Sequence, residues 1–126
     1  MNKYKLEVSF KDKRGKIVDL ISGEKINAIT YLSFNKNAVR GNHYHKKTIQ
    51  WTYVVSGKIR VVSQKLGKGI TKLIIKKGDL IVDEKNESHA MKALENSEIV
   101  VFTKGPRGGK EYEKDTYRLQ KLLINT

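Results

Sequence analysis

The sequence predicts an all-β domain in the form of a sandwich or small barrel, and two observations support this prediction. Val, Ile and Thr together number 29 of the 126 residues, whereas Ala numbers only 4, a balance that favours strands over helices. Short apolar or alternating segments also recur at intervals of about 8–12 residues, with turn residues between them. We expect one domain over residues 1–126, because two separate cores would each be marginal at this length.

Eight segments have the apolar or alternating pattern of strands. In chain order they are Tyr4–Phe10, Lys16–Ser22, Ile26–Phe34, Gln50–Val55, Ile59–Gln64, Ile70–Ile75, Leu80–Val82 and Glu98–Thr103. Segments rich in Gly, Asn, Asp or Ser separate them, and these residue types favour turns. The turns are Lys13-Arg14-Gly15, Ser22-Gly23, Asn35-Lys36-Asn37, Ser56-Gly57, Leu66-Gly67-Lys68-Gly69, Lys77-Gly78-Asp79 and Glu84-Lys85-Asn86. The carboxyl end, Tyr117–Ile124, fits a short helix, a final strand or a dimer arm.

The chain carries 26 Lys and Arg residues against 13 Asp and Glu residues, a formal net charge of +13. A surface this basic attracts anions such as nucleic acids, anionic lipids or phosphorylated small molecules. A solvated Lys-rich surface explains the same charge, because 21 of the basic residues are lysines scattered along the chain. The concentrated basic helix or interleaved aromatic residues of a nucleic-acid binder are missing, so we expect no nucleic-acid partner.

Composition also excludes several classes of protein. The chain contains no cysteine, which excludes a disulfide scaffold, thiolate metal sites and a cysteine nucleophile. No segment approaches the about 18 consecutive apolar residues of a membrane span. The first five residues lead into a charged strand-like segment rather than the apolar core of a signal peptide. We therefore expect a cytoplasmic protein without a membrane partner.

All three histidines fall into one spaced pattern. His43 and His45 form an H-x-H pair, and on a strand two residues at this spacing face the same side. His89 follows Gly78 by eleven residues, and strand pairing in a small barrel would bring it opposite the first two. Three neutral imidazoles with the oxygen of Gln50 would suit a divalent Zn, Ni, Fe or Mn ion.

This pattern resembles the cupin superfamily. The first cupin motif, G-x5-H-x-H-x3,4-E-x6-G, matches from His43 through Gly57, with Gln50 in place of the Glu and Asn37 in place of the first Gly. The second motif, G-x5-P-x-G-x2-H-x3-N, keeps only Gly78 and His89. The resemblance covers about residues 26–104 and implies a double-stranded β-helix, or jelly-roll barrel, with the site inside the barrel. The neutral amide of Gln50 would hold a metal less strongly than a carboxylate does.

A finer resemblance concerns residues 40–50. Arg40-Gly41-Asn42-His43-Tyr44-His45-Lys46-Lys47-Thr48-Ile49-Gln50 resembles the R-G-x-H-x-H-K-x3-Q stretch of the nucleotide-sugar 3,4-ketoisomerases. These cupins move a carbonyl between C3 and C4 of a dTDP-4-keto-6-deoxyhexose without a metal. The beginning of the stretch is also similar to that of the dTDP-4-dehydrorhamnose 3,5-epimerases, and residues 110–118 resemble the ketoisomerase ending.

This resemblance implies an isomerase or epimerase of an NDP-4-keto-deoxyhexose, with His43 and His45 as base and partner. Histidine suits this chemistry because it accepts and donates protons near neutral pH. Arg40 is the candidate cation for the diphosphate or the ketone oxygen, and Tyr31 the candidate further acid. Gln50 and Arg60 are further candidates for substrate binding. The substrate would be a small anionic molecule, which the basic surface attracts.

Two other functions remain open on the same residues. One is a metal-dependent cupin, such as a small-molecule dioxygenase or sugar-phosphate isomerase, with His43, His45, Gln50 and His89 as ligands. The other is a non-catalytic cupin that binds a sugar or nucleotide. Trp51 and Tyr53 lie on the strand face opposite Gln50, so we expect them between sheets or at the contact of a homodimer.

Overall fold

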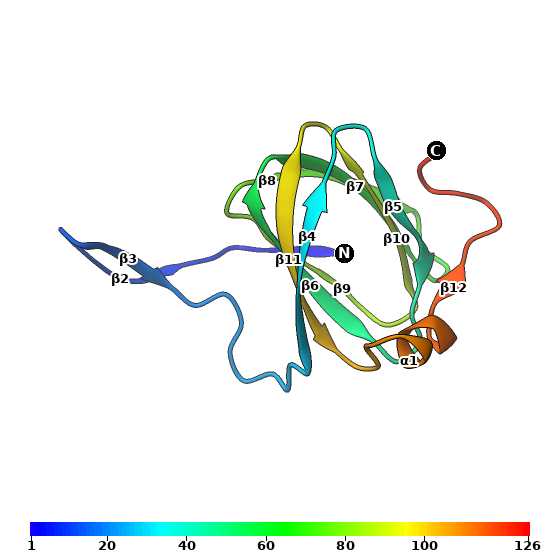
Figure 1. The fold of residues 1–126 in the computed structure, drawn as a ribbon, viewed down its shortest axis with the longest axis horizontal. Coiled ribbons are helices and arrows are strands. Elements are labelled where there is room, and N and C mark those ends of the chain that lie inside the picture. The colour runs from blue at the N-terminus through cyan, green and yellow to red at the C-terminus, as the bar shows by residue number, and fades with distance from the viewer.

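The computed structural model describes residues 1–126 and is a barrel of two five-stranded antiparallel sheets, with a separate hairpin beside it (Figure 1). The first sheet has the order β1 (Asn2–Tyr4), β9 (Leu80–Asp83), β6 (Ile49–Ser56), β11 (Ser97–Lys104) and β4 (Ala28–Phe34). The second has the order β12 (Tyr117–Arg118), β5 (Val39–Tyr44), β10 (Glu87–Ala93), β7 (Lys58–Lys65) and β8 (Ile70–Lys76). The hairpin pairs β2 (Val8–Asp12) with β3 (Gly15–Val18), and one short helix, α1 (Lys110–Lys114), precedes β12. The all-β jelly roll that the sequence predicts is confirmed.

The side chains that face into the barrel are apolar in one half of the interior and polar in the other half. The apolar half is the main core, whose buried members include Phe34, Val54, Ile59, Val61, Ile75, Ile81 and Ile99. The same strands then present polar side chains inward. Along β6, for example, Val54 belongs to the core, whereas Thr52 and Gln50 are buried polar residues. Because buried polar groups cost free energy unless they are paired, this half of the barrel indicates a site.

Trp51 belongs to a second, smaller cluster on the outside of the first sheet. It is 4% exposed and lies with Leu80 and Val82 in this cluster. Leu6, Ile21 and Ile26, from the segments that flank the hairpin, pack against these residues. The alternation predicted for β6 is therefore confirmed, but Trp51 is covered by its own chain and is not free to form a subunit contact.

Several predicted boundaries differ from the structure. The segment Tyr4–Phe10 divides into β1 and β2, and Lys16–Ser22 ends as a strand at Val18. Two strands, β5 and β10, were outside the eight predicted segments, because their inward positions carry histidines and glycine rather than a regular apolar series. The carboxyl segment Tyr117–Ile124, for which the sequence allowed a short helix, a final strand or a dimer arm, begins with the two-residue strand β12. No helix in the structure is long and apolar enough to cross a membrane.

Candidate active site

A cavity of about 430 Å³ opens between the two sheets at the polar half of the barrel. Its polar and aromatic wall consists of Arg40, His43, Gln50, Thr52, Asp83, His89, Arg107 and Tyr112. The apolar residues Leu32, Val39, Met91, Ile99 and Val101 complete the wall. This mixture of an apolar body and a few converging polar groups is typical of a small-molecule site.

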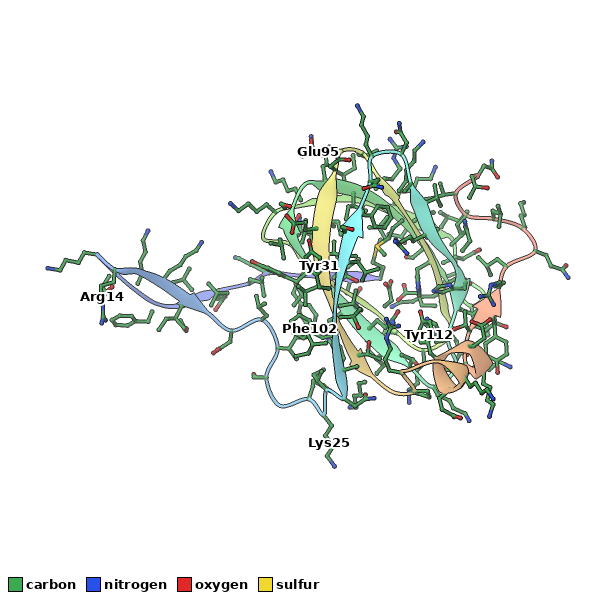
Figure 2. The ribbon with its side chains drawn as sticks, viewed as in Figure 1. Arg14, Lys25, Tyr31, Glu95, Phe102 and Tyr112 are labelled. Carbon is green, nitrogen blue, oxygen red and sulfur yellow. The ribbon has the colours of Figure 1, made fainter.

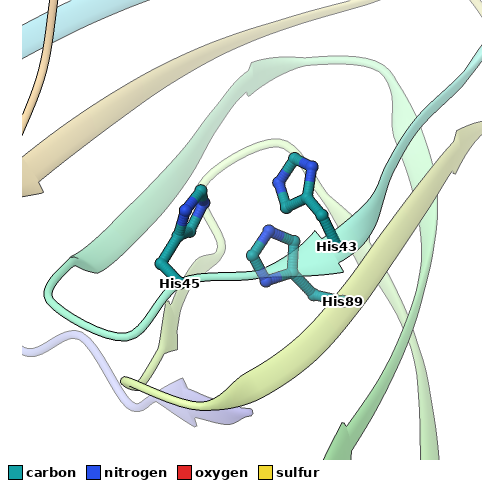
Figure 3. A group of neighbouring side chains, drawn as sticks. All are labelled: His43, His45 and His89. Carbon is teal, nitrogen blue, oxygen red and sulfur yellow. The ribbon is translucent and has the colours of Figure 1, made fainter. Parts of the chain in front are cut away.

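The second sheet brings the three histidines together (Figure 3). His43 on β5 and His89 on β10 are directly paired across the two antiparallel strands, and His45 follows the end of β5. The ring of His43 lies 4.8 Å from that of His45 and 4.7 Å from that of His89. One nitrogen atom from each ring lies within 4.8 Å of the others. The predicted convergence of these histidines is therefore present in the structure.

Hydrogen bonding determines how the His45 ring is oriented. Its Nδ1 lies 2.8 Å from the main-chain carbonyl oxygen of Asp115. A carbonyl oxygen only accepts, so Nδ1 must carry the hydrogen and donate it. The Nε2 atom of this buried ring then has a free lone pair, and it has no hydrogen-bond partner in the protein. An unpaired buried acceptor next to two other imidazoles is available to a proton or a ligand.

Asp115 is itself held in place by three donors from the segment that follows β5. Its carboxylate accepts hydrogen bonds from the Thr48 hydroxyl at 2.6 Å and from the main-chain N–H groups of Lys47 and Lys46 at 3.0 and 3.1 Å. Burial raises the pKa of Asp115, but these hydrogen bonds outweigh that effect and leave the pKa below its usual value. The carboxylate therefore connects the α1 end of the chain to the β5–β6 turn and positions the carbonyl that orients His45.

Burial keeps two of the histidines neutral near pH 7. Burial, together with the nearby His89 and His45 rings, lowers the pKa of His43 to about 3. Burial also lowers the pKa of His89 to about 3. A neutral imidazole has a free lone pair, so both rings are chemically able to accept a proton or bind a metal.

The facing sheet contributes a group of polar side chains around Gln50. In the strand register Gln50 pairs with Asp83 on one side and Thr103 on the other. Burial raises the pKa of Asp83 to about 7, and its Oδ1 atom has no hydrogen-bond partner. Its Oδ2 atom lies 4.0 Å from Nδ1 of His89. Gln50 is therefore in the cavity as predicted, and Asp83 is a carboxyl group of the site that sequence reasoning missed.

Two guanidinium groups line the cavity. Arg40 on β5 was predicted, and its Cζ atom lies 5.5 Å from the centre of the Phe34 ring. Arg107 lies in the segment before α1, with its Cζ atom 4.4 Å from the centre of the Tyr112 ring. Neither Arg107 nor Tyr112 was among the predicted site residues, although Tyr112 lies in the segment 110–118 that resembles the ketoisomerase ending. Two cations on its wall make the cavity suitable for an anion.

Tyr31 and Arg60 do not belong to this cavity. On β4 the side chain of Leu32 faces the cavity, so Tyr31 points outward; it is 59% exposed and bonds Glu98 at 2.5 Å. Arg60 lies between the buried Ile59 and Val61 on β7 and lines a separate surface hollow. Alternation along each strand directs both side chains away from the barrel interior.

Comparison with known protein families agrees with this architecture. Residues 10–117 match the family model described as the polysaccharide biosynthesis C-terminal domain. The chain belongs to this family. Comparison with curated proteins by sequence gives no match.

Three solved structures share the fold of this chain. A sugar 3,4-ketoisomerase from Thermoanaerobacterium thermosaccharolyticum in complex with TDP gives a TM-score of 0.76 at 17% identity, covering 94% of this chain and 88% of that chain. The TDP-quinovose 3,4-ketoisomerase from Campylobacter jejuni gives 0.75 at 20% identity, covering 90% and 94%. A dTDP-4-dehydrorhamnose 3,5-epimerase from Bacillus anthracis with TDP and PPi bound gives 0.72 at 14% identity, covering 86% and 74%. The predicted cupin fold is confirmed.

Proposed function

We propose that this polysaccharide biosynthesis C-terminal domain isomerises or epimerises an NDP-4-keto-deoxyhexose by histidine-mediated proton transfer. The observation that carries the proposal is a neutral His43 on the wall of a cavity that also holds the guanidinium groups of Arg40 and Arg107. The first group is a base, and the other two are binding groups for an anion. The family match to polysaccharide biosynthesis and the cupin fold support the same substrate class.

Arg40 and Arg107 would bind the diphosphate of the substrate. Guanidinium groups form paired hydrogen bonds with phosphate oxygens and stay charged at every relevant pH. The net charge of +13 would also attract the substrate to the cavity from solution. Val39 and Met91 line the same cavity and would contact the sugar ring beside His43.

His43 would remove the proton from the carbon next to the ketone. The electron pair of that C–H bond then forms the double bond of an enediolate, and the proton returns to one of its two carbons. Moving the carbonyl also requires transfer of a hydroxyl proton, and Asp83 on the facing wall can hold that proton because its pKa is near 7. His45, held by Asp115, would present its Nε2 lone pair to the other imidazoles and so stabilise a protonated neighbour.

Titration calorimetry tests the binding part of the proposal. Chelator-treated protein is titrated with TDP and UDP at two salt concentrations, and the same protein is then incubated with TDP-4-keto-6-deoxyglucose. We expect saturable nucleotide binding without metal and a new keto sugar that is lost in His43→Asn, while nucleotide binding is kept. Binding without turnover would identify a non-catalytic cupin, and no binding would refute a nucleotide-sugar substrate.

A metal-dependent cupin is the second candidate, favoured by three imidazole nitrogens within 4.8 Å of one another. The donor set fits a divalent ion in kind: His43, His45 and His89 would hold it, with Gln50 as the oxygen ligand. A bound ion would polarise a carbonyl oxygen of the substrate. Elemental analysis of protein purified without chelator tests this candidate: about one ion per chain, and activity lost with its removal, would favour it over the metal-free reaction.

A further inference from the structure

The second sheet is rich in basic residues and has almost no acidic ones. Strands β5, β7, β8 and β12 contain no Asp or Glu, and residues 116–126 also contain none. The one acid of β10, Glu87, is only 1% exposed. The cations of this sheet are Arg40, Lys58, Arg60, Lys65, Lys72, Lys76, Lys92 and Arg118. Although lysines are scattered along the sequence, the fold therefore gathers positive charge on one wall of the barrel.

Five of these cations point away from the barrel interior. On β7 the core residues Ile59 and Val61 point inward, so Arg60 between them points outward. Cross-strand partners point to the same side of a sheet, which extends this outward set onto β8 and β10. We call the set the basic face; it consists of Lys58, Arg60, Lys72, Lys76 and Lys92. None of the five forms an ion pair within the chain.

Four of the five cations are arranged as like-charged pairs. Lys58 lies directly opposite Lys76 across β7 and β8, and Arg60 lies directly opposite Lys92 across β7 and β10. Like charges at directly opposite positions destabilise a sheet. Glu95 follows Lys92 by three residues, but it lies in the turn at the end of the barrel (Figure 2). An anionic surface outside the chain would relieve this repulsion.

Aliphatic side chains are exposed among these cations. Ile70 and Ile74 on β8 are each 55% exposed, and Leu66 in the β7–β8 turn is 87% exposed. Ile74 is the cross-strand partner of Arg60, so it belongs to the same side of the sheet. A surface hollow of about 410 Å³ on this side is lined by Arg60, Val62, Lys72, Leu123 and Ile124. The basic face thus combines unpaired positive charge with exposed aliphatic groups.

We propose that the basic face binds the surface of an anionic lipid bilayer. Its cations lie at the headgroups, and Leu66, Ile70 and Ile74 enter the boundary between headgroups and acyl chains. Such binding increases with the buried apolar area and with the electrostatic attraction to anionic lipids. A soluble acidic polymer would match the cations but would leave the isoleucines in water, so the mixture of both kinds of side chain favours a bilayer.

Peripheral binding of this kind is compatible with the other properties of the chain. The expectation of no membrane partner rested on the lack of a spanning segment, which a peripheral contact does not need. Arg60 and Lys72 line the surface hollow and no part of the active-site cavity. Bilayer binding and turnover are therefore separable, and substitutions at these two positions test the first without removing a group of the site.

Vesicle flotation with charge variants tests the electrostatic part of the proposal. We expect the unmodified chain to float with vesicles of equal parts phosphatidylglycerol and phosphatidylcholine, and not with vesicles of phosphatidylcholine alone. Each cation at an anionic bilayer contributes about fivefold in affinity. Replacing both Arg60→Glu and Lys72→Glu should therefore weaken binding at least about 25-fold.

The matched control makes the same change of charge on the other wall of the barrel. Lys5 and Lys25 are exposed and adjoin Leu6 and Ile26, which pack on the outside of the first sheet; Lys25 is labelled in Figure 2. The double variant Lys5→Glu and Lys25→Glu should bind about as well as the unmodified chain, because charges beyond a Debye length of the bilayer are screened. An equal loss of binding in both double variants, or no flotation of the unmodified chain, would overturn the proposal.

Ile74→Ser distinguishes a bilayer from a soluble acidic polymer. The substitution removes an exposed aliphatic side chain without a change of charge. It should weaken vesicle binding about tenfold and leave binding to soluble poly-glutamate unchanged. Vesicle binding that is insensitive to Ile74→Ser would overturn the proposal and identify an acidic polymer as the partner. Fluorescence of the single buried Trp51 reports that each variant is folded.

Discussion

Replacing Asp115 by Ala tests how the site orients His45. The change removes a carboxylate that accepts hydrogen bonds from Thr48, Lys47 and Lys46, while the main-chain carbonyl that binds His45 stays in the chain. The Thr48 hydroxyl is buried, so leaving it unpaired costs about 1–3 kcal/mol. With about 1 kcal/mol for each amide, we expect a loss of about 3–5 kcal/mol of unfolding free energy.

The functional effect is separate from this loss of stability. Without its carboxylate anchor the segment at residue 115 shifts, and the His45 ring loses the acceptor that keeps the hydrogen on Nδ1. We expect kcat to fall about 10- to 100-fold with KM nearly unchanged, because a misplaced proton-transfer group affects the transition state rather than nucleotide binding. Asp115→Asn keeps one acceptor oxygen for Thr48 and should recover part of the activity.

Two measurements would check this reasoning. Denaturant unfolding gives the stability, and ¹⁵N NMR of the imidazoles gives the tautomer, in a spectrum simplified by the presence of only three histidines. Asp79→Ala is the matched control, because that carboxylate also accepts a main-chain N–H, from Lys76 at 2.9 Å, but lies outside the cavity wall. If Asp115→Ala leaves both the His45 tautomer and kcat at the level of this control, the positioning role is refuted.

Three further predictions concern the cavity. Binding of TDP should raise the pKa of His43 from about 3, because a nearby anion favours the protonated ring; NMR titration with and without TDP checks this. The raised folded-state pKa of Asp83, about 7 against 3.8, means that the contribution of this carboxyl to stability falls by about 4 kcal/mol as pH rises from about 3.8 to about 7. The lowered pKa values of His43 and His89 act in the opposite direction over this range, so the stability of Asp83→Asn should increase more steeply with pH than that of the unmodified chain, as measured by denaturant unfolding. Arg40→Ala should weaken TDP binding at least tenfold and reduce its salt dependence in calorimetry, whereas Arg60→Ala should change neither.

The sequence predicted the fold and the histidine centre because both depend on local spacing. His43 and His45 had to share a strand face, and the pairing of His89 with His43 followed from antiparallel strands in a small barrel. This pairing holds although the second cupin motif lacks its Pro, its second Gly and its Asn. Strand register therefore determines the position of the His89 imidazole, and the other residues of the second cupin motif are not required for it.

The remaining site residues could not be found from spacing alone. Asp83 resembles any acid at a strand end, and its importance comes from burial beside Gln50, which is a property of packing. Arg107 and Tyr112 reach the cavity because the segment after β11 folds back over the barrel, and no periodic signal marks that path. Tyr31 was misplaced although the alternation of the buried Phe34 and the inward Leu32 indicates that it points outward.

Proton exchange at the sugar carbon tests the central claim most directly. Chelator-treated protein is incubated with TDP-4-keto-6-deoxyglucose in D₂O, and ¹H NMR follows the hydrogens on the carbons next to the ketone. The account predicts that deuterium enters one of these positions at a rate that depends on the protein and is abolished in His43→Asn. A bound substrate that keeps all of these hydrogens in the presence of the unmodified chain would contradict it.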